Sequence, residues 1–211
     1  MMMNRVSSRV NLIENYLDEL YPNPRCELNY NKDYELLIAV VLSAQTTDKR
    51  VNEVTSILFN KYQNLKELSE APIEDISDII KPIGTFRKKA QFVHDIAKKL
   101  HEDYNDVVVN DRSVLENLPG VGRKTANVVL SNLFNVPAIA VDTHVCRVSK
   151  RLSLAKESDD VSVVEEKLMK KINRDNWAKR HHQLVLFGRY YCKAINPVCE
   201  NCKLKDICKR K

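Results

Sequence analysis

Hydrophobic residues recur along almost the whole chain at the three- and four-residue spacing of helices. One face of a first helix is formed by Val10, Ile13, Leu17 and Leu20. Pro22 and Pro24 follow this face and are expected to end the helix. Residues 34–42 are too continuously apolar for a surface helix, which predicts a buried central one. No strand alternation and no long repeat interrupt the pattern, so the predicted fold class is all-α.

Capping and turn signals divide the rest of the chain. Asp48 is expected to cap a helix. Ser113 and Glu116 have the spacing of a capping box, which predicts a helix start at Ser113. That helix should stop at Leu118, and another should open directly after Gly122. Two helices are therefore expected to be joined with almost no linker.

The composition is that of a folded and moderately basic protein. The 211 residues are 44% hydrophobic and 29% charged, which suits one large or two small domains. The formal charge of +6 permits a polyanionic partner without requiring one. Only four glycines occur, fewer than the turns of an all-β protein would need. No apolar run approaches the roughly 20 residues of a membrane span, so we expect no membrane partner and a cytoplasmic location.

The short joint Leu118–Gly122 is a candidate anion site. Its two glycines permit backbone angles that other residues resist, and they let another surface approach closely. The following helix directs free N–H groups and the positive end of its dipole outward, where Arg123 and Lys124 add charge. A Gly-x-Gly turn alone is more typical of an ordinary helix connection. The basic pair favours an anion such as a phosphate, without specifying which.

Four of the six cysteines crowd the C-terminus, and their spacing is Cys192-x6-Cys199-x2-Cys202-x5-Cys208. In a reducing compartment such a group is more typical of a metal site than of disulfides. Four thiolates suit tetrahedral zinc or an iron–sulfur cluster. The second Cys-x2-Cys pair that is usual in zinc ribbons is absent, but the spacing alone leaves both metals open.

Three motifs, in this order and spacing, resemble the endonuclease III family of helix-hairpin-helix DNA glycosylases with lyase activity. They are the segment Leu118–Ala126 (LPGVGRKTA), the segment Val141–Val145 (VDTHV) and the four C-terminal cysteines. The likeness spans nearly the whole chain, from Leu42 onward. It implies a 4Fe–4S cluster on Cys192, Cys199, Cys202 and Cys208. It also implies that the partner is double-stranded DNA with damaged bases or abasic sites, and we expect the protein to act as a monomer.

The resemblance places Lys124 at the catalytic lysine of the family and Asp142 at its catalytic aspartate. A damaged nucleotide must be flipped out of the duplex before its sugar can be attacked. A lysine attacks only as a neutral amine, and the helix dipole and Arg123 favour that form, whereas DNA phosphates oppose it. Asp142 can help to deprotonate the amine and can stabilise positive charge on the sugar. The resulting Schiff base opens the way to β-elimination.

Without the resemblance, both residues have simpler interpretations. Lys124 would then be a phosphate-binding lysine, which is common after such turns. Asp142 would be a helix N-cap, because Asp-Thr-His before a helical run suits capping. Capping and catalysis are compatible, since a capped carboxylate is held rigidly.

The resemblance also implies a set of DNA contacts. They are Gln45, Ile83, Gly84, Thr85, Gly120, Val121, Gly122, Arg123 and Lys193. Gln45 matches the residue that fills the gap left by the extruded base, and the turn 83–86 matches a second wedge. The family often has leucine at the position of Thr85, so Ile83 or Phe86 is expected to share the wedge. The positions expected to line the damage pocket or contact DNA are Ser43, Glu116, His144 and Arg147.

Two helical domains that flank a DNA-binding groove are expected. Residues 26–136 would form a helical-barrel domain with the helix-hairpin-helix motif. Residues 1–25 and 137–211 would form the second domain with the cluster. Residues 192–211 contain six Lys or Arg and two Asp or Glu, so this cluster loop is expected to contact phosphates through Lys193.

The implied function is bifunctional base excision, in which oxidised or ring-damaged pyrimidines are removed and the abasic site is cleaved. One alternative within the same fold is a mismatch glycosylase, a group that usually lacks a lysine at the position of Lys124. Another alternative is a DNA-binding or redox-sensing module without catalysis. Such a module would use the hairpin and the cluster but would need neither Lys124 nor Asp142.

Overall fold

The computed structural model describes residues 2–210, with side chains from Ser8 onward, and this part of the chain is helical without a strand. The all-α prediction is therefore confirmed. The α-helices are α1 (Met2–Leu20), α2 (Asp33–Leu42), α3 (Asp48–Lys61), α4 (Leu65–Glu70), α5 (Ile73–Ile79), α6 (Phe86–Tyr104), α7 (Arg112–Glu116), α8 (Arg123–Phe134), α9 (Thr143–Arg151), α10 (Val161–Lys171) and α11 (Trp177–Leu186). Shorter turns are the 3-10 helices η1 (Arg174–Asn176) and η3 (Lys205–Ile207) and the π-helix η2 (Phe187–Tyr191).

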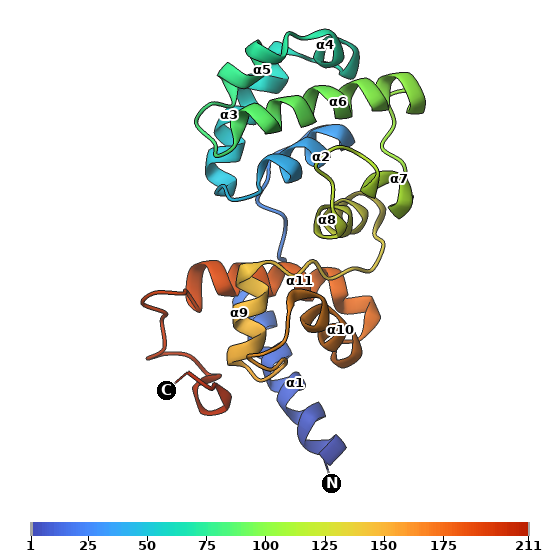
Figure 1. The fold of residues 1–211 in the computed structure, drawn as a ribbon. Coiled ribbons are helices and arrows are strands. Elements are labelled where there is room, and N and C mark those ends of the chain that lie inside the picture. The colour runs from blue at the N-terminus through green and yellow to red at the C-terminus, as the bar shows by residue number, and fades with distance from the viewer. Residues whose placement is uncertain (1, 211) are drawn as a thin grey trace. The chain divides into compact units, whose positions relative to one another are not determined.

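The chain folds into two compact units (Figure 1). The inserted unit is one continuous segment, Glu27–Phe134, and contains α2 to α8. The terminal unit combines the chain up to Cys26 with everything from Asn135 onward. Among the described residues, no helix is both long enough and apolar enough to cross a lipid bilayer.

The inserted unit is organised around α2. Every residue from Tyr34 to Leu42 is buried, as the continuous apolar run predicts. Helices α3, α6 and α8 pack against α2, and α6 also lies along α4 and α5. On α6 the buried face comprises Lys89, Ala90, Val93, Ile96, Ala97 and Leu100. Helix α2 is thus buried on all sides, whereas α6 buries one stripe against its neighbours.

The terminal unit joins the first helix to segments more than 160 residues away in the sequence. Ile13 and Leu17 of α1 pack in one core with Leu184 and Phe187. Beside this core, the buried Arg180 donates to Glu14 Oε1 at 3.0 Å and to Asp18 Oδ1 at 2.7 Å. Helix α1 is therefore held on α11 by both apolar packing and ion pairs.

Two predicted helix starts are wrong by one or two residues. Helix α3 is capped by Thr47, whose hydroxyl accepts from the amide of Arg50, while Asp48 is the first helical residue. Helix α7 is capped by Asp111, whose Oδ1 accepts from the amides of Ser113 and Val114 at 2.7 and 3.2 Å. One carboxylate that satisfies two free amides competes well against a serine hydroxyl, so Ser113 lies inside the helix.

Candidate functional site

The joint between α7 and α8 is a tight turn. Its Val121 is buried, and the amide of Val121 donates to Leu118 O at 3.1 Å. Gly120 has φ +74°, and a Cβ built there would lie 2.5 Å from Cδ2 of Phe92 on α6. Both the backbone angle and the close packing therefore require glycine at position 120.

Gly122 differs from Gly120, because nothing within the protein requires it. It has no positive φ, and a Cβ built on it would meet no atom within 4 Å. The residue is exposed and lies just before the first residue of α8. A glycine in such an open position suits the close approach of an external surface.

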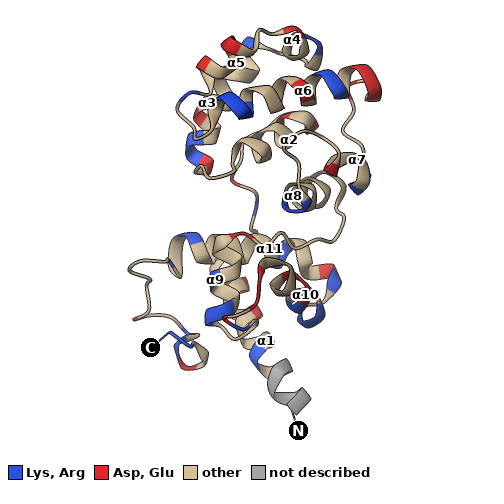
Figure 2. Cartoon of the chain, viewed as in Figure 1, with Lys and Arg blue, Asp and Glu red and all other residues tan. Residues whose placement is uncertain are grey.

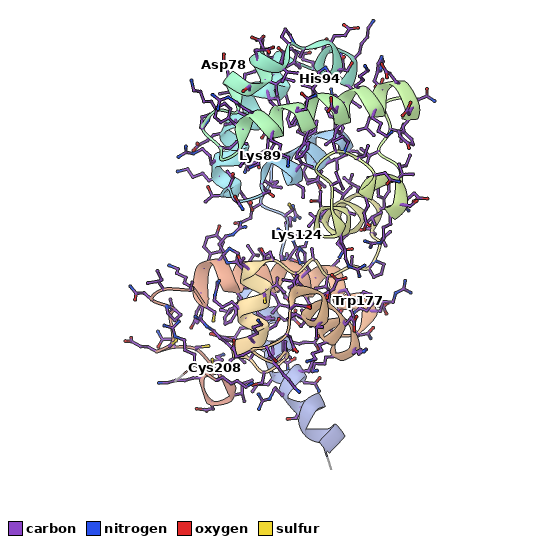
Figure 3. The ribbon with its side chains drawn as sticks, in the orientation of Figure 1. Asp78, Lys89, His94, Lys124, Trp177 and Cys208 are labelled. Carbon is purple, nitrogen blue, oxygen red and sulfur yellow. The ribbon has the colours of Figure 1, made fainter. Side chains whose placement is uncertain are left out.

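Lys124 is the second residue of α8 (Figure 3) and is exposed, as is Arg123 before it. Basic residues colour part of α8 blue in Figure 2. Free amides at a helix N-terminus point away from the helix and carry partial positive charge. The side chains and the backbone at this end of α8 thus form one positively charged surface beside the hairpin. The arrangement can bind an anion, and it presents an amine to solvent.

Asp142 caps α9. Its Oδ1 accepts from the amide of Val145 at 2.7 Å, and the side chain is half-buried. The carboxylate makes no other hydrogen bond within the described part of the chain, so its second oxygen stays available. The capping interpretation is therefore confirmed, and the cap holds the carboxylate in a defined orientation.

Helix α9 also holds the beginning of the cysteine-rich segment through two arginines. Arg147 Nη2 donates to Gly188 O at 2.6 Å, and its Nε donates to Cys192 O at 3.2 Å. Arg151 Nη1 donates to Lys193 O at 2.7 Å and to Cys192 Sγ at 3.3 Å. Because Asp142 starts the same helix, its position is tied to the segment that carries the cysteines.

Helix α9 also packs directly on η2. A Cβ built on Gly188 would lie 2.8 Å from His144 Cβ and 3.1 Å from His144 O. Only glycine therefore permits this approach of the two backbones. The His144 ring is held by Arg147, whose Nη2 lies 3.3 Å from its Nδ1. Burial and nearby Arg151 lower the pKa of Arg147, although arginine remains charged.

The four C-terminal cysteines line a cavity of about 480 Å³, together with Leu152, Phe187 and Tyr191. Burial raises the pKa of the Cys202 thiol, and the other three cysteines act in the same direction. Among the described residues, no group of three His, Cys, Asp or Glu converges as the ligands of one ion do. Four thiols that line one cavity supply the sulfur ligands that either a zinc ion or an iron–sulfur cluster requires.

The predicted wedge residues lie in two turns of the inserted unit. Gln45 is exposed with φ 56°, and Thr85 is exposed with φ 55°. Ile83 is only 3% exposed, so its side chain anchors the second turn from inside. Gly84 beside it is exposed. The half-buried Phe86 begins α6 and is the apolar side chain of this turn that reaches the surface.

The remaining predicted positions are partly engaged within the protein. The Ser43 hydroxyl donates to Val40 O at 2.8 Å, and Glu116 accepts from Arg112 at 3.1 Å. Lys193 is exposed at the start of the cysteine-rich loop. Ser43 and Glu116 belong to the inserted unit, whereas Lys193 belongs to the terminal unit with His144 and Arg147.

Lys89 is not among the positions that the sequence motifs predict. Its side chain is buried, and its ammonium contacts the backbone just before Gln45. A signal for it exists in the sequence, because Lys89 precedes Val93 by one helical turn on an otherwise apolar face of α6. A charged side chain in such an apolar stripe needs hydrogen-bond partners inside the protein, because burial removes it from water.

Known proteins match this chain over most of its length. The model of the family "HhH-GPD superfamily base excision DNA repair protein" matches residues 38–174. Endonuclease III of Bacillus subtilis (strain 168) is 48% identical over 193 residues, which are 92% of this chain and 88% of that protein. Endonuclease III of Escherichia coli (strain K12) is 44% identical over 195 residues, which are 92% of each.

A solved structure described as a trapped endonuclease III-DNA covalent intermediate has a TM-score of 0.92 to this chain. It is 46% identical, and the match covers 96% of this chain and 95% of that one. The family match, the two relatives and this structure agree with the family resemblance that the sequence indicates. The chain belongs to the endonuclease III family, within the HhH-GPD superfamily of base excision DNA repair proteins.

Proposed function

We propose that this base excision repair enzyme is a bifunctional DNA glycosylase and abasic-site lyase that uses Lys124 as its nucleophile. The observation that carries the proposal is an exposed lysine in the first turn of α8, directly behind the Gly120–Gly122 hairpin. The solved covalent complex of a related endonuclease III with DNA supports covalent catalysis. An amine placed beside a phosphate-binding turn reaches the sugar next to the bound phosphate.

In the reaction, the neutral amine of Lys124 attacks C1′ of the flipped nucleotide. The bond from C1′ to the base breaks, its electron pair leaves with the base, and the base takes up a proton. Ring opening then gives a Schiff base between C1′ and Nζ. Loss of a C2′ proton expels the 3′ phosphate by β-elimination, and water hydrolyses the imine to regenerate the lysine.

Asp142 has two roles in this proposal. Its carboxylate accepts a proton from the Lys124 ammonium and stabilises positive charge that develops on the sugar. The hydrogen bond from the Val145 amide uses one oxygen of this carboxylate and leaves the other for these two roles. Asp142→Asn keeps an oxygen that can cap α9 but removes the charge, so base removal should fall sharply while stability is retained.

We assign DNA binding to the hairpin and to the two turns of the inserted unit. Gly120 and Gly122 let the backbone approach a phosphate, and Arg123 adds charge. Gln45 enters the gap left by the flipped nucleotide, and Thr85 with Phe86 contacts the opposite strand. Lys193 contacts a phosphate from the cysteine-rich loop.

The substrates we propose are oxidised or ring-damaged pyrimidines in duplex DNA, together with abasic sites. The enzyme acts as a monomer where the chromosomal DNA lies, in the cytoplasm. A mismatch glycosylase would have no use for a nucleophilic lysine at position 124, and a binding module would cleave nothing. A strand-cleavage assay on thymine glycol duplex and abasic duplex separates the three functions.

We further propose that Cys192, Cys199, Cys202 and Cys208 hold a 4Fe–4S cluster. The cavity of about 480 Å³ between the thiols supports this assignment. When bound, the cluster supplies order to a loop that has little apolar packing of its own. Purified protein should be brown and contain four irons per chain, whereas one zinc per chain in colourless protein would contradict the assignment.

Borohydride trapping tests the lysine. Reduction of the Schiff base should link wild-type protein covalently to a duplex that contains an abasic site. Lys124→Ala should give no such adduct. Lys170→Ala removes another exposed charge, on α10, and should trap like the wild type. Efficient trapping by Lys124→Ala would overturn the assignment.

A further inference from the structure

Lys89 is a buried lysine that has no acidic partner among the described side chains. It lies in the first turn of α6 (Figure 3), and only 4% of its surface is exposed to solvent. Its Nζ donates to Leu42 O at 2.9 Å, to Ala44 O at 2.6 Å and to Thr46 Oγ1 at 3.2 Å. Burial lowers the pKa of this lysine, since it disfavours the charged form. A buried ammonium is costly unless it is hydrogen-bonded, so its position depends on the three groups that it binds.

All three acceptors belong to the end of α2 and to the turn that carries Gln45. Leu42 is the last residue of α2, where carbonyl groups lack helical partners and the helix dipole is negative. Ala44 and Thr46 are the two neighbours of Gln45 in the chain. The ammonium thus holds the backbone carbonyl before Gln45 and the side-chain hydroxyl after it, while the Gln45 side chain remains exposed.

The same lysine is one helical turn away from Thr85. The amide of Lys89 donates to Thr85 O at 3.1 Å, so its backbone continues the helix that starts at the second turn. A second link runs in parallel, from Arg50 Nη1 to Pro82 O at 3.4 Å. Two cations therefore link the Thr85 turn to the neighbouring segment: Lys89 to the Gln45 turn, and Arg50 to the start of α3.

Both turns are also strained at their exposed residue. Gln45 and Thr85 have left-handed backbone angles, with φ 56° and 55°. Such angles are unfavourable for residues other than glycine, and most of all for β-branched threonine. They persist only where the surrounding structure holds them. Both strained residues are exposed, and Lys89 is bonded to both of their turns. This arrangement indicates that the position of one turn relative to the other is important.

We propose that Lys89 is a positioning residue that locks the Gln45 turn to the Thr85 turn, so that both enter the DNA duplex as one rigid pair. This inference rests on the proposed roles of Gln45 and Thr85 in the duplex. Lys89 itself touches no DNA. It acts by keeping the distance between the two turns constant when the nucleotide is flipped.

Helix α6 extends this coupling to the hairpin. Phe92 lies three residues after Lys89, on the neighbouring part of the helix, and it packs against Gly120. One helix of the inserted unit thereby supports both wedge turns and the phosphate-binding turn. A shift of α6 would displace all three, whereas loss of the Lys89 ammonium would free the Gln45 turn alone.

The test is a double-mutant cycle between Lys89→Met and Gln45→Ala. Methionine matches the length of lysine but donates no hydrogen bond. Two quantities are measured: the ratio of Kd values for undamaged duplex and for duplex with a tetrahydrofuran abasic analogue, and the fluorescence of 2-aminopurine opposite the analogue. Lys98→Met removes a charge from the exposed face of the same helix and is the matched control.

Lys89→Met should lower the Kd ratio about tenfold and reduce the fluorescence rise, because three bonds to an ammonium are lost. In the Gln45→Ala background the same change should lower the ratio less than twofold, since the residue it positions is gone. Lys89→Arg should restore part of the ratio, and Lys98→Met should leave it unchanged. Equal losses in both backgrounds, or no loss in either, would overturn the proposal.

Folding is followed by circular dichroism and thermal melting. If Lys89→Met does not fold, Lys89→Gln and Thr46→Val carry the same cycle with smaller changes. Wild-type protein without a preference for the abasic duplex would refute the proposed function itself. A Gln45→Ala variant that keeps the full preference would refute the proposed role of Gln45. If Gln45→Ala behaves as proposed and every Lys89 variant behaves like the wild type, only the positioning role fails.

Discussion

The hairpin end of the inserted unit and the cysteine-rich loop are both proposed to contact DNA, but they owe their order to different forces. Behind the hairpin, α2 is buried along its whole apolar run, and Leu36, Leu37 and Ile38 are 0% exposed. In the loop 192–210, Leu204 is the only buried residue. Hydrogen bonds from Arg151 of α9 hold the start of this loop, and the four thiols face one cavity.

This difference indicates how each region should respond to change. A surface supported by packed helices keeps its geometry without a ligand and loses it when the packing is damaged. A loop with little apolar burial depends on what its thiols bind. The two contacts can therefore be broken separately.

The largest effect is expected from Lys124→Ala. The side chain is exposed and supports no packing, so the free energy of unfolding should stay within about 0.5 kcal/mol of the wild type. Cleavage of an abasic duplex should fall by at least about 10³-fold, because the nucleophile is removed. Denaturant unfolding and a gel assay measure the two quantities. A large loss of stability would show that Lys124 also has a structural role.

The next largest effect is expected from truncation of an apolar side chain, and the loss of stability should differ between the inserted unit and the loop. Leu37→Ala leaves a cavity in the inserted unit and should lower the free energy of unfolding by about 2–5 kcal/mol. Val198→Ala in the loop, where the side chain is 42% exposed, should change it by less than about 0.5 kcal/mol. Equal losses in urea titrations would mean that the loop is packed like the core.

The two hairpin glycines should respond differently to alanine. Gly120→Ala meets the Phe92 ring and an unfavourable φ, so it should cost about 1–3 kcal/mol of stability. Gly122→Ala meets no atom of the protein, and its stability should be nearly that of the wild type. Its affinity for duplex DNA should nevertheless fall, because a methyl group then stands where a phosphate approaches. Melting curves and fluorescence anisotropy distinguish the pair.

The smallest effect concerns acid stability of the terminal unit. Hydrogen bonds from Arg180 hold the pKa of Asp18 well below its usual range. A depressed carboxyl pKa stabilises the fold above the unfolded value of about 3.9, and this stability is lost as the pH falls towards the folded value. After allowance for solvent screening, the contribution is about 1 kcal/mol. Asp18→Asn should remove this part of the pH dependence, as stability measured between pH 5 and 2 would show.

Local pattern was sufficient for much of the fold. The helical period, the buried run of α2 and the turn at Leu118–Gly122 all follow from neighbours in the chain. Helix starts are predicted less accurately than the helices themselves, because Thr47 and Asp111 compete with nearby polar residues for the same free amides. The choice between such caps depends on how the preceding turn packs, which a local pattern does not contain.

The sequence by itself determined the helices, the hairpin with Lys124 behind it, and four cysteines close enough in the chain to share one site. These features depend on residues a few positions apart, where covalent geometry limits the possibilities. Only the tertiary structure decided that Phe92 packs on Gly120, that Lys89 holds both sides of Gln45, and that Arg147 and Arg151 hold Cys192. Those contacts join segments 28 to 45 residues apart. They form because helices must bury their apolar faces together, and no periodicity in one segment specifies its partner.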